Sequence, residues 1–373
     1  MRAAFWAAAA LLFYTYAGYP IWLWLRSRWR ARPVHRAPWT PSVSIVMVVR
    51  NEEAVLEPKL RNLLGLNYPQ ELLGVVVVSD GSTDGTNEIL GNYASGGQLR
   101  PVLSPQSRGK AAGLNNALAA ATGEIIVFTD ARQKIEGDAV RLLTENFADL
   151  SVGCASGELM LGDPDSSEAA KGMGLYWRIE KRIRELESAS GSVVGATGAL
   201  YAVRRKLMRP LPASTILDDV YIPLQVARQG YRVIFDSRAR AWDVPDQGAS
   251  REFARKVRTL SGNYQLVQLA PWLLTGANPL RFEFVSHKLL RLFSPFALAV
   301  MLVASCFLST PSYRIGLVLQ LAFYGLSALA AVRLVGGPIA RMADAAFVFM
   351  MLNLAAAVAF ANFVTGRKVA WTR

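Results

Sequence analysis

Two short apolar runs, each ending in an aspartate, constrain the fold of this chain most. Residues 75–80 read Val-Val-Val-Val-Ser-Asp, and residues 124–130 read Glu-Ile-Ile-Val-Phe-Thr-Asp. Runs of β-branched or aromatic residues bounded by turn residues are typical of strands buried on both faces, as in a parallel sheet. Each strand therefore carries an aspartate to its carboxyl end, the edge where open α/β sheets bind ligands. We expect these aspartates to face ribose hydroxyls, polar base edges or a hard cation on phosphates.

Four long apolar stretches predict membrane spans. The first, Ala3–Leu25, is almost uncharged and is followed at once by four arginines within residues 26–32. A cleavable signal peptide is the alternative here, but the length and the lack of a small-residue cleavage site before the arginines favour a span. Three further runs of spanning length lie in the C-terminal third, at residues 292–308, 315–332 and 342–364. Because arginines flank the cytoplasmic side of spans, we expect a multi-pass protein of the inner (cytoplasmic) membrane whose polar region lies in the cytosol.

These stretches divide the chain into four parts. We expect an N-terminal transmembrane helix with a basic linker over 1–39 and a cytosolic α/β domain over 40–265. An interfacial amphipathic segment over 266–291 and about three transmembrane helices over 292–373 follow.

The basic charge of the chain does not indicate a nucleic-acid partner. The net charge is +13, but the basic residues cluster beside the spans and on the stretches 178–184 and 251–258. Anionic membrane lipid and diphosphate ligands explain that placement. The two cysteines lie far apart, so neither a disulfide framework nor a zinc site is expected. His35 and His287 are also isolated in the sequence, which leaves no nucleophile–histidine pair.

Strands and helices alternate through the first half of the polar region. The pattern predicts strands at 42–49, 75–80, near 102 and at 125–128, with helices at 54–66, 86–93 and 110–121. This order favours a mostly parallel sheet with flanking helices. No G-x-G-x-x-G motif follows the first strand, and Ala111 follows Gly109-Lys110 in place of Ser or Thr. A dinucleotide-binding fold and a P-loop are therefore unsupported.

Four motifs in this region carry a resemblance to a known family. They read SIVMVVRNEE at 44–53, SDGSTDGT at 79–86, GKAAGLN at 109–115 and GEIIVFTDA at 123–131. In this order, with spans on both sides, they resemble the membrane-bound family 2 glycosyltransferases of GT-A fold, which make polysaccharides or lipid-linked sugars. The resemblance implies a GT-A nucleotide-diphospho-sugar transferase domain and an inverting hexosyltransferase.

The resemblance also implies which residues bind the nucleotide-sugar donor. Glu52 resembles the acidic residue near the nucleotide, and Asp80 resembles the aspartate that accepts the imide N–H of uracil, so we expect a UDP-sugar. Lys110 begins a predicted helix, where its charge and the helix N-terminus both favour an anion, although an ordinary solvated lysine is the alternative. Asp84 either contacts the donor or caps the helix at 86–93.

Asp130 resembles the first aspartate of the family's D-x-D motif, which holds a divalent cation on the donor diphosphate. Arg132 stands in place of the second aspartate, where a guanidinium contacts phosphate directly. We still expect Mg²⁺ or Mn²⁺, because one carboxylate, the diphosphate and waters complete an octahedron.

An acidic pair in the second half of the polar region is the candidate base. Asp218 and Asp219 follow a glycine-rich stretch at 191–199, and the family carries an acidic pair in that place. Asp219 resembles the general base that takes the proton from the acceptor hydroxyl, with Asp218 as its partner. Because a helix begins here, a capping role is the alternative for either aspartate.

Residues 255–259 lie where processive members of the family carry Q-x-x-R-W. Arg258 matches the arginine, but Thr259 replaces the tryptophan that stacks on the acceptor sugar, so we expect single additions. The expected acceptor is lipid-linked or an exopolysaccharide, with partners of a polysaccharide assembly system. A processive polysaccharide synthase is the alternative, and a non-catalytic sugar-nucleotide sensor is a more distant one.

Overall fold

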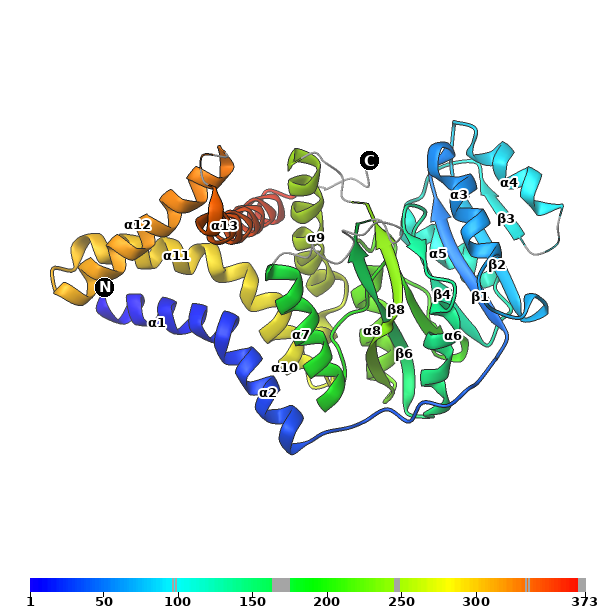
Figure 1. The fold of residues 1–373 in the computed structure, drawn as a ribbon, viewed down its shortest axis with the longest axis horizontal. Coiled ribbons are helices and arrows are strands. Elements are labelled where there is room, and N and C mark those ends of the chain that lie inside the picture. Colours follow the sequence, from blue (N-terminus) through cyan, green and yellow to red (C-terminus); the bar gives the residue numbers. More distant parts are fainter. Residues whose placement is uncertain are drawn as a thin grey trace.

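A mixed sheet of eight strands forms the centre of the polar domain (Figure 1). The computed structural model describes residues 1–95, 97, 99–162, 175–244, 249–332, 334 and 336–367. The strand order is β3-β2-β1-β4-β7-β6-β8-β5. The strands are β1 (Val43–Val49), β2 (Leu73–Asp80), β3 (Leu99–Ser104), β4 (Ile125–Phe128), β5 (Lys134–Ile135), β6 (Val152–Leu161), β7 (Tyr201–Arg204) and β8 (Arg232–Asp243).

The first half of this sheet is parallel, as the sequence predicts. Strands β3, β2, β1 and β4 all pair in parallel, so their carboxyl ends meet at one edge. Strand β7 is antiparallel to both β4 and β6, whereas β6 and β8 are parallel. A mostly parallel arrangement with antiparallel insertions results, which confirms the predicted α/β class.

Helices cover both faces of the sheet because each central strand is apolar on both sides. Val46 and Val48 of β1 pack in one core with α5, whereas Ile45 and Met47 pack in the opposite core with α3. The helices of the polar domain are α3 (Glu53–Leu64), α4 (Thr86–Ala94), α5 (Lys110–Ala120), α6 (Ala139–Glu145), α7 (Leu175–Ser190), α8 (Asp218–Arg228) and α9 (Ala249–Leu269).

The apolar helices lie together at one end of the molecule (Figure 1). They are α1 (Arg2–Phe13), α2 (Tyr19–Trp29), α11 (Leu290–Phe307), α12 (Pro311–Ala331) and α13 (Gly337–Val364). Among the described residues, three helices are long and apolar enough to cross a membrane, at 281–307, 311–331 and 339–364. They match the three C-terminal stretches in the sequence, which confirms their number.

The N-terminal region is helical from Arg2 to Trp29, but its two halves have different neighbours. Helix α1 lies along α11, whereas α2 packs against α7 of the polar domain. Tyr19 and Leu23 of α2 are fully buried against Ile183 and Leu186 of α7. Short turns that include α10 (Arg281–Glu283) connect α9 with the first C-terminal span. Helix α7 therefore joins the sheet to the apolar helices.

Candidate active site

Three aspartates and a lysine meet at the carboxyl edge of the parallel strands. Asp130 lies two residues after the end of β4, Lys110 begins α5, and Asp218 with Asp219 begins α8. The Lys110 Nζ lies 3.0 Å from Asp130 Oδ1 and 3.2 Å from Asp218 Oδ1. Asp130, just after a strand, and Asp218, at the start of a helix, thus share one ammonium group although they lie far apart in the sequence. The pairing also holds Lys110 cationic, because Asp130 and Asp218 raise its pKa against the effect of its burial.

Asp219 has the electrostatic setting of a general base. Its burial and the charge of Asp218 raise the pKa of Asp219 from 3.8 to about 6, although Lys110 opposes the shift. Asp218 is instead held by the ammonium of Lys110 and lies 3.5 Å from the hydroxyl of Tyr201, which donates to it. Two adjacent carboxylates whose surroundings differ in this way are suited to different roles.

The glycine-rich stretch forms the floor beneath these carboxylates. The backbone N–H of Ala196 donates to the carbonyl oxygen of Asp219 at 2.7 Å. A β-carbon on Gly198 would lie 3.2 Å from Asp219 Oδ2, closer than nine in ten such contacts. The stretch therefore approaches the candidate base closely, and the lack of a side chain on Gly198 leaves room for the Asp219 carboxylate.

Tyr201 was not among the residues singled out in the sequence. It is fully buried on β7, and its ring stacks on Phe128 of β4 with centroids 4.4 Å apart and an interplanar angle of 5°. The stack aims its hydroxyl at Asp218. A sequence cannot show this pair, because β4 and β7 become neighbours only in the folded sheet.

Asp80 is buried beneath a loop. Its carboxylate accepts hydrogen bonds from the Ser107 hydroxyl at 2.8 Å and from the backbone N–H groups of Arg108 and Gly109 at 2.8 and 2.9 Å. The loop crosses Gly81, where a β-carbon would lie 2.4 Å from the Ser107 nitrogen. Gly81 also has a φ of 68°, which favours glycine. Asp80 thus orders the loop that leads into Lys110.

Asp84 and Glu52 lie together at the ends of two helices. Asp84 accepts from the backbone N–H of Thr86 at 3.1 Å and from that of Glu53 at 3.2 Å. These contacts match the capping alternative, because they satisfy first-turn N–H groups of α4 and α3. Glu52 precedes α3, and its own N–H donates to the Thr86 hydroxyl at 2.9 Å.

A buried lysine behind the β4 end was also missed in the sequence. The ammonium of Lys59, only 3% exposed, donates to the Thr129 hydroxyl at 2.9 Å and to the Gln133 carbonyl at 2.6 Å. These bonds fix the loop that carries Asp130 and Arg132. Burial lowers the pKa of Lys59 to about 7, while Asp130 opposes the change. The sequence signal that could have indicated it is a lysine at one of the apolar positions of a predicted helix.

In the described part of the chain, the two predicted donor-binding arginines are not among the ion-pair partners of the Lys110 cluster. Arg132 is exposed two residues beyond Asp130, and Arg258 is half-buried on α9. The structure brings Asp218 and Asp219 together with Lys110 and Asp130. The other predicted donor-binding carboxylates, Asp80, Asp84 and Glu52, lie at neighbouring loops and helix starts.

The residues around Asp130 fit a divalent cation whose ligands come mainly from bound phosphate and water. Within the described ranges, no three His, Cys, Asp or Glu side chains form a group that could hold a metal alone. Asp130 is 42% exposed, however, and the Lys110 ammonium already occupies the space between it and Asp218. Carboxylate oxygens around a cationic group are the hard ligands that Mg²⁺ and Mn²⁺ prefer. Asp130 would hold such an ion together with phosphate oxygens and water.

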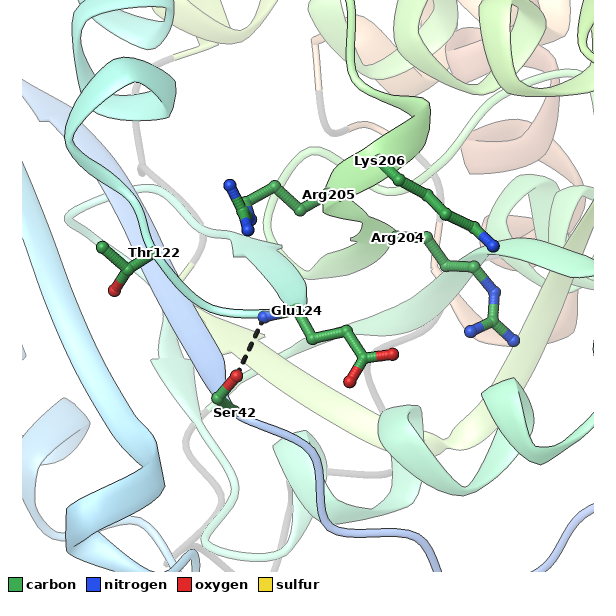
Figure 2. A pocket seen from close by; sticks show the side chains of 6 residues that line it. All are labelled: Ser42, Thr122, Glu124, Arg204, Arg205 and Lys206. Carbon is green, nitrogen blue, oxygen red and sulfur yellow. Dashed lines mark hydrogen bonds between the residues drawn. The ribbon is translucent and has the colours of Figure 1, made fainter.

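An exposed pocket lies elsewhere, away from this cluster. Figure 2 shows a pocket whose residues precede β1 and β4 or end β7, at the amino edge of the parallel strands. Its lining is Ser42, Thr122, Glu124, Arg204, Arg205 and Lys206. The Glu124 N–H donates to the Ser42 hydroxyl at 3.0 Å, which braces the two strand starts. The pocket therefore contains none of the clustered aspartates.

His287 is not isolated in the fold. Its Nδ1 lies 2.8 Å from Glu187 Oε1, and its Nε2 lies 3.1 Å from Glu180 Oε1. The sequence alone does not show these partners, because α7 supplies two carboxylates from about one hundred residues earlier.

Comparison with known proteins assigns the part of the chain that carries Asp130 and Lys110 to a family. The model of Glycosyl transferase family 2 matches residues 44–211, which include β1, the Asp80 and Asp130 strand ends and Lys110. Residues 44–211 therefore form a family 2 glycosyltransferase domain. The sheet order and flanking helices are accordingly those of a GT-A domain, and the predicted family and enzyme class are confirmed.

Polysaccharide synthases and a solved mannosyltransferase are among the similar proteins. The chain is 21% identical to the poly-β-1,6-N-acetyl-D-glucosamine synthase of Staphylococcus epidermidis over 62% of this chain and 56% of that protein. The Staphylococcus aureus synthase (strain COL) is 21% identical over 60% and 55%. The chain thus spans little more than half the length of these curated relatives. The mannosyltransferase PcManGT from Pyrobaculum calidifontis, solved with GDP-Man and Mn²⁺, is 26% identical with a TM-score of 0.71, covering 98% of this chain and 100% of that one.

Proposed function

We propose that the chain transfers a sugar, with inversion, from a nucleotide-sugar donor to an acceptor at the cytoplasmic face of the inner membrane. The observation that carries the proposal is the Asp218–Asp219 pair beside Lys110 and Asp130. One carboxylate there is neutralised by an ammonium, and the other has a pKa raised to about 6 by burial and by its neighbour. A base near neutrality and a cationic group for phosphate are the two requirements of this reaction.

In the proposed reaction Asp219 takes the proton of the acceptor hydroxyl. The hydroxyl oxygen forms a bond to the anomeric carbon while the bond from that carbon to the diphosphate oxygen breaks. The electron pair leaves with the nucleoside diphosphate, and the proton remains on Asp219 until it is released to water. Asp218 keeps Lys110 in place beside Asp219.

Positive charge around Asp130 would bind the departing diphosphate. Lys110, at the start of α5, and the exposed Arg132 supply cationic donors, and Arg258 of α9 is a further candidate. A Mg²⁺ or Mn²⁺ ion held by Asp130 would neutralise the charge that develops on the leaving group. The Mn²⁺ in the similar mannosyltransferase supports this assignment.

The nucleobase of the donor would lie at the strand ends near Glu52 and Asp80. Asp80 already accepts three hydrogen bonds from the 107–109 loop, so its effect on a uracil would act through one remaining acceptor position or through that loop. Asp84, engaged by two helix ends, would shape the same edge. We propose a UDP-sugar, and the GDP-Man of the similar mannosyltransferase makes GDP-sugars the first comparison.

The domain division at 1–39, 40–265, 266–291 and 292–373 belongs to the same proposal. Three helices long enough to span a membrane lie on one side of the catalytic domain, and arginines follow the N-terminal helix. This arrangement supports a multi-pass protein with lipid-linked or polysaccharide acceptors and with partners of a polysaccharide assembly system.

Nucleoside diphosphate release by the full chain in a neutral detergent tests the proposal. UDP-, GDP- and dTDP-sugars are compared with and without an undecaprenyl phosphate acceptor, using wild type, Asp219→Asn and Asp138→Asn. Asp138 is a surface carboxylate paired with Arg141, which makes it a matched control. We expect one donor class to be turned over, with a loss of about 10²-fold or more only in Asp219→Asn. Equal release by Asp219→Asn and wild type would remove Asp219 from the mechanism.

A processive polysaccharide synthase is the second candidate. The synthase names of the two staphylococcal relatives favour it. Against it, Thr259 on α9 offers an acceptor sugar no aromatic ring. The length of the product decides between the two.

A further inference from the structure

A lysine stands among the apolar residues that α3 packs against the sheet. The buried residues of this helix share the spacing of one helical face and are Leu56, Lys59, Leu60 and Leu63. Lys59 is as deeply buried as its apolar neighbours, with 3% of its surface exposed. A buried ammonium group costs free energy unless hydrogen bonds or opposite charges compensate it. A lysine in this position therefore needs a reason beyond the filling of space.

The Lys59 ammonium joins the two ends of the loop that follows β4. It donates to the Thr129 hydroxyl at 2.9 Å and to the Gln133 carbonyl oxygen at 2.6 Å. Three residues lie between these partners, and they include Asp130 and Arg132, the two groups that we assign to the donor diphosphate. One side chain thus closes this loop across its base.

Helix α3 holds the same segment at a second point. Asn62, about one helical turn further along α3, donates to the Ile135 carbonyl oxygen at 2.8 Å and accepts from the Ile135 N–H at 2.8 Å. Ala131, inside the loop, is buried in the core that contains the leucines of α3. The backbone of residues 129–135 is therefore fixed from behind by α3, whereas the Asp130 side chain remains partly exposed for a ligand.

The charge of Lys59 suits a loop that binds an anion. Within the described ranges, both hydrogen-bond partners of its ammonium are neutral oxygens, so no ion pair cancels the charge. The Asp130 carboxylate stabilises the ammonium through space, since it opposes the effect of burial on the pKa of Lys59. A positive charge behind the loop favours negative charge in front of it. A methionine would fill similar space but would supply neither the two donors nor the charge.

Thr129 extends this contact to the floor of the site. Its hydroxyl accepts from Lys59 and donates to the Ala199 carbonyl oxygen at 2.9 Å. The preceding residue, Gly198, closely approaches the Asp219 carboxylate. The buried ammonium therefore lies beneath both the loop assigned to the diphosphate and the stretch that supports the candidate base.

We propose that Lys59 is a positioning residue that fixes the 129–133 loop for binding of the donor diphosphate. This inference rests on the proposed glycosyl transfer, because that reaction supplies the diphosphate. Lys59 itself would contact neither donor nor acceptor, since it lies beneath the loop. Its loss should weaken binding of the phosphate groups and leave binding of the nucleoside, which would lie near Glu52 and Asp80, almost unchanged.

Nucleotide binding to the full chain in an uncharged detergent tests the inference. UDP and GDP, each with Mn²⁺, are compared with uridine and guanosine, which carry no phosphate, for wild type, Lys59→Met and Thr129→Val. Both substitutions keep the approximate size of the side chain and remove the hydrogen bond between positions 59 and 129. We expect both variants to bind the nucleoside diphosphate at least about tenfold more weakly, whereas nucleoside affinity should change less than about twofold.

Two further variants control for general effects of substitution. Arg61→Met is the matched control on the same helix, because Arg61 is 70% exposed and pairs with Glu57. Thr129→Ser keeps the hydroxyl that Thr129→Val removes, so it should restore the diphosphate affinity. Thermal unfolding, measured in parallel, shows which variants are folded, and Thr129→Val provides the test if Lys59→Met does not fold.

The outcomes separate this inference from the proposed reaction. Selective loss of diphosphate affinity in Lys59→Met or Thr129→Val supports the positioning role even where no sugar is transferred. Wild-type diphosphate affinity in both folded variants overturns it even where transfer proceeds. An equal loss for diphosphate and nucleoside also overturns it, because a purely structural role would affect both ligands alike. Nucleotide binding without any sugar transfer by the wild type would contradict the proposed reaction alone.

Discussion

We expect the activity–pH profile to depend on two charged neighbours of Asp219, Asp218 and Lys110, whose effects on its pKa are opposite. Burial and Asp218 raise the pKa of Asp219 to about 6, whereas Lys110 lowers it. A base must be ionised to act, so activity is lost as pH falls through that value. With a pKa of about 6, roughly nine in ten Asp219 side chains are ionised at pH 7 and roughly one in ten at pH 5. We therefore expect kcat/KM to fall about tenfold between pH 7 and pH 5.

Two substitutions should shift the acidic limb of the profile, the pH range in which activity falls as Asp219 is protonated. Asp218→Asn removes the like charge, so the limb shifts to lower pH, and Lys110→Met removes the opposing cation, so the limb shifts to higher pH. A shift of one pH unit corresponds to about 1.4 kcal/mol of interaction between the charges. Both variants also lose ion pairs around Lys110, so the position of the limb is measured and its height is not.

The assay is nucleoside diphosphate release at subsaturating donor across pH 4.5 to 8.5, because kcat/KM reports ionisations of the free enzyme. Asp138→Asn, at the exposed pair with Arg141, should leave the limb in place. A profile that is flat between pH 5 and 7 would refute the raised pKa. Shifts of the same sign in Asp218→Asn and Lys110→Met would refute the assignment of the two charges.

Three further predictions concern the metal, the floor of the site and the product. Excess EDTA should abolish transfer, and Mg²⁺ or Mn²⁺ should restore it with weak affinity because Asp130 would be the one protein carboxylate on the ion; full activity in EDTA would contradict the metal and leave Arg132 as the group that neutralises the diphosphate. Gly198→Ala places a methyl group 3.2 Å from Asp219 Oδ2, so kcat should fall about tenfold with an unchanged donor KM. Gly276→Ala, where no atom lies within 4 Å, is its control, and equal kcat values in the two variants would contradict the close packing. Mass spectrometry of the lipid fraction should show one added sugar, since Thr259 lacks the stacking ring; a ladder of homopolymer from one donor would identify a synthase.

The strands and the aspartates at their ends were predictable, because burial on both faces demands apolar runs. Val75–Val78 and Ile125–Phe128 have that pattern, and a parallel sheet then places their following residues at one edge. The sequence also indicated Lys110 and the Asp218–Asp219 pair as separate candidates. Their shared contact was not predictable, because it depends on how α5 and α8 approach β4.

Other features depended on long-range packing that no local pattern carries. The 107–109 loop folds over Asp80, so an aspartate expected to be open to a ligand is buried. His287 meets Glu180 and Glu187 across about one hundred residues of chain. The spacing of Glu180, Arg184 and Glu187 fits one face of α7, yet nothing in the sequence shows which distant segment that face meets.

The joint between α2, α7 and the first C-terminal span has a consequence for biosynthesis. Arg26 of α2 pairs with Glu283 of α10, which lies 257 residues later in the chain. At roughly 5–20 residues per second, α2 emerges from the ribosome about 13–50 s before its partner exists. During that interval Glu180 and Glu187 of α7 also lack His287 and Arg291. The catalytic domain can form its sheet early, but its attachment to the apolar helices is completed only when residues 283–291 have been made.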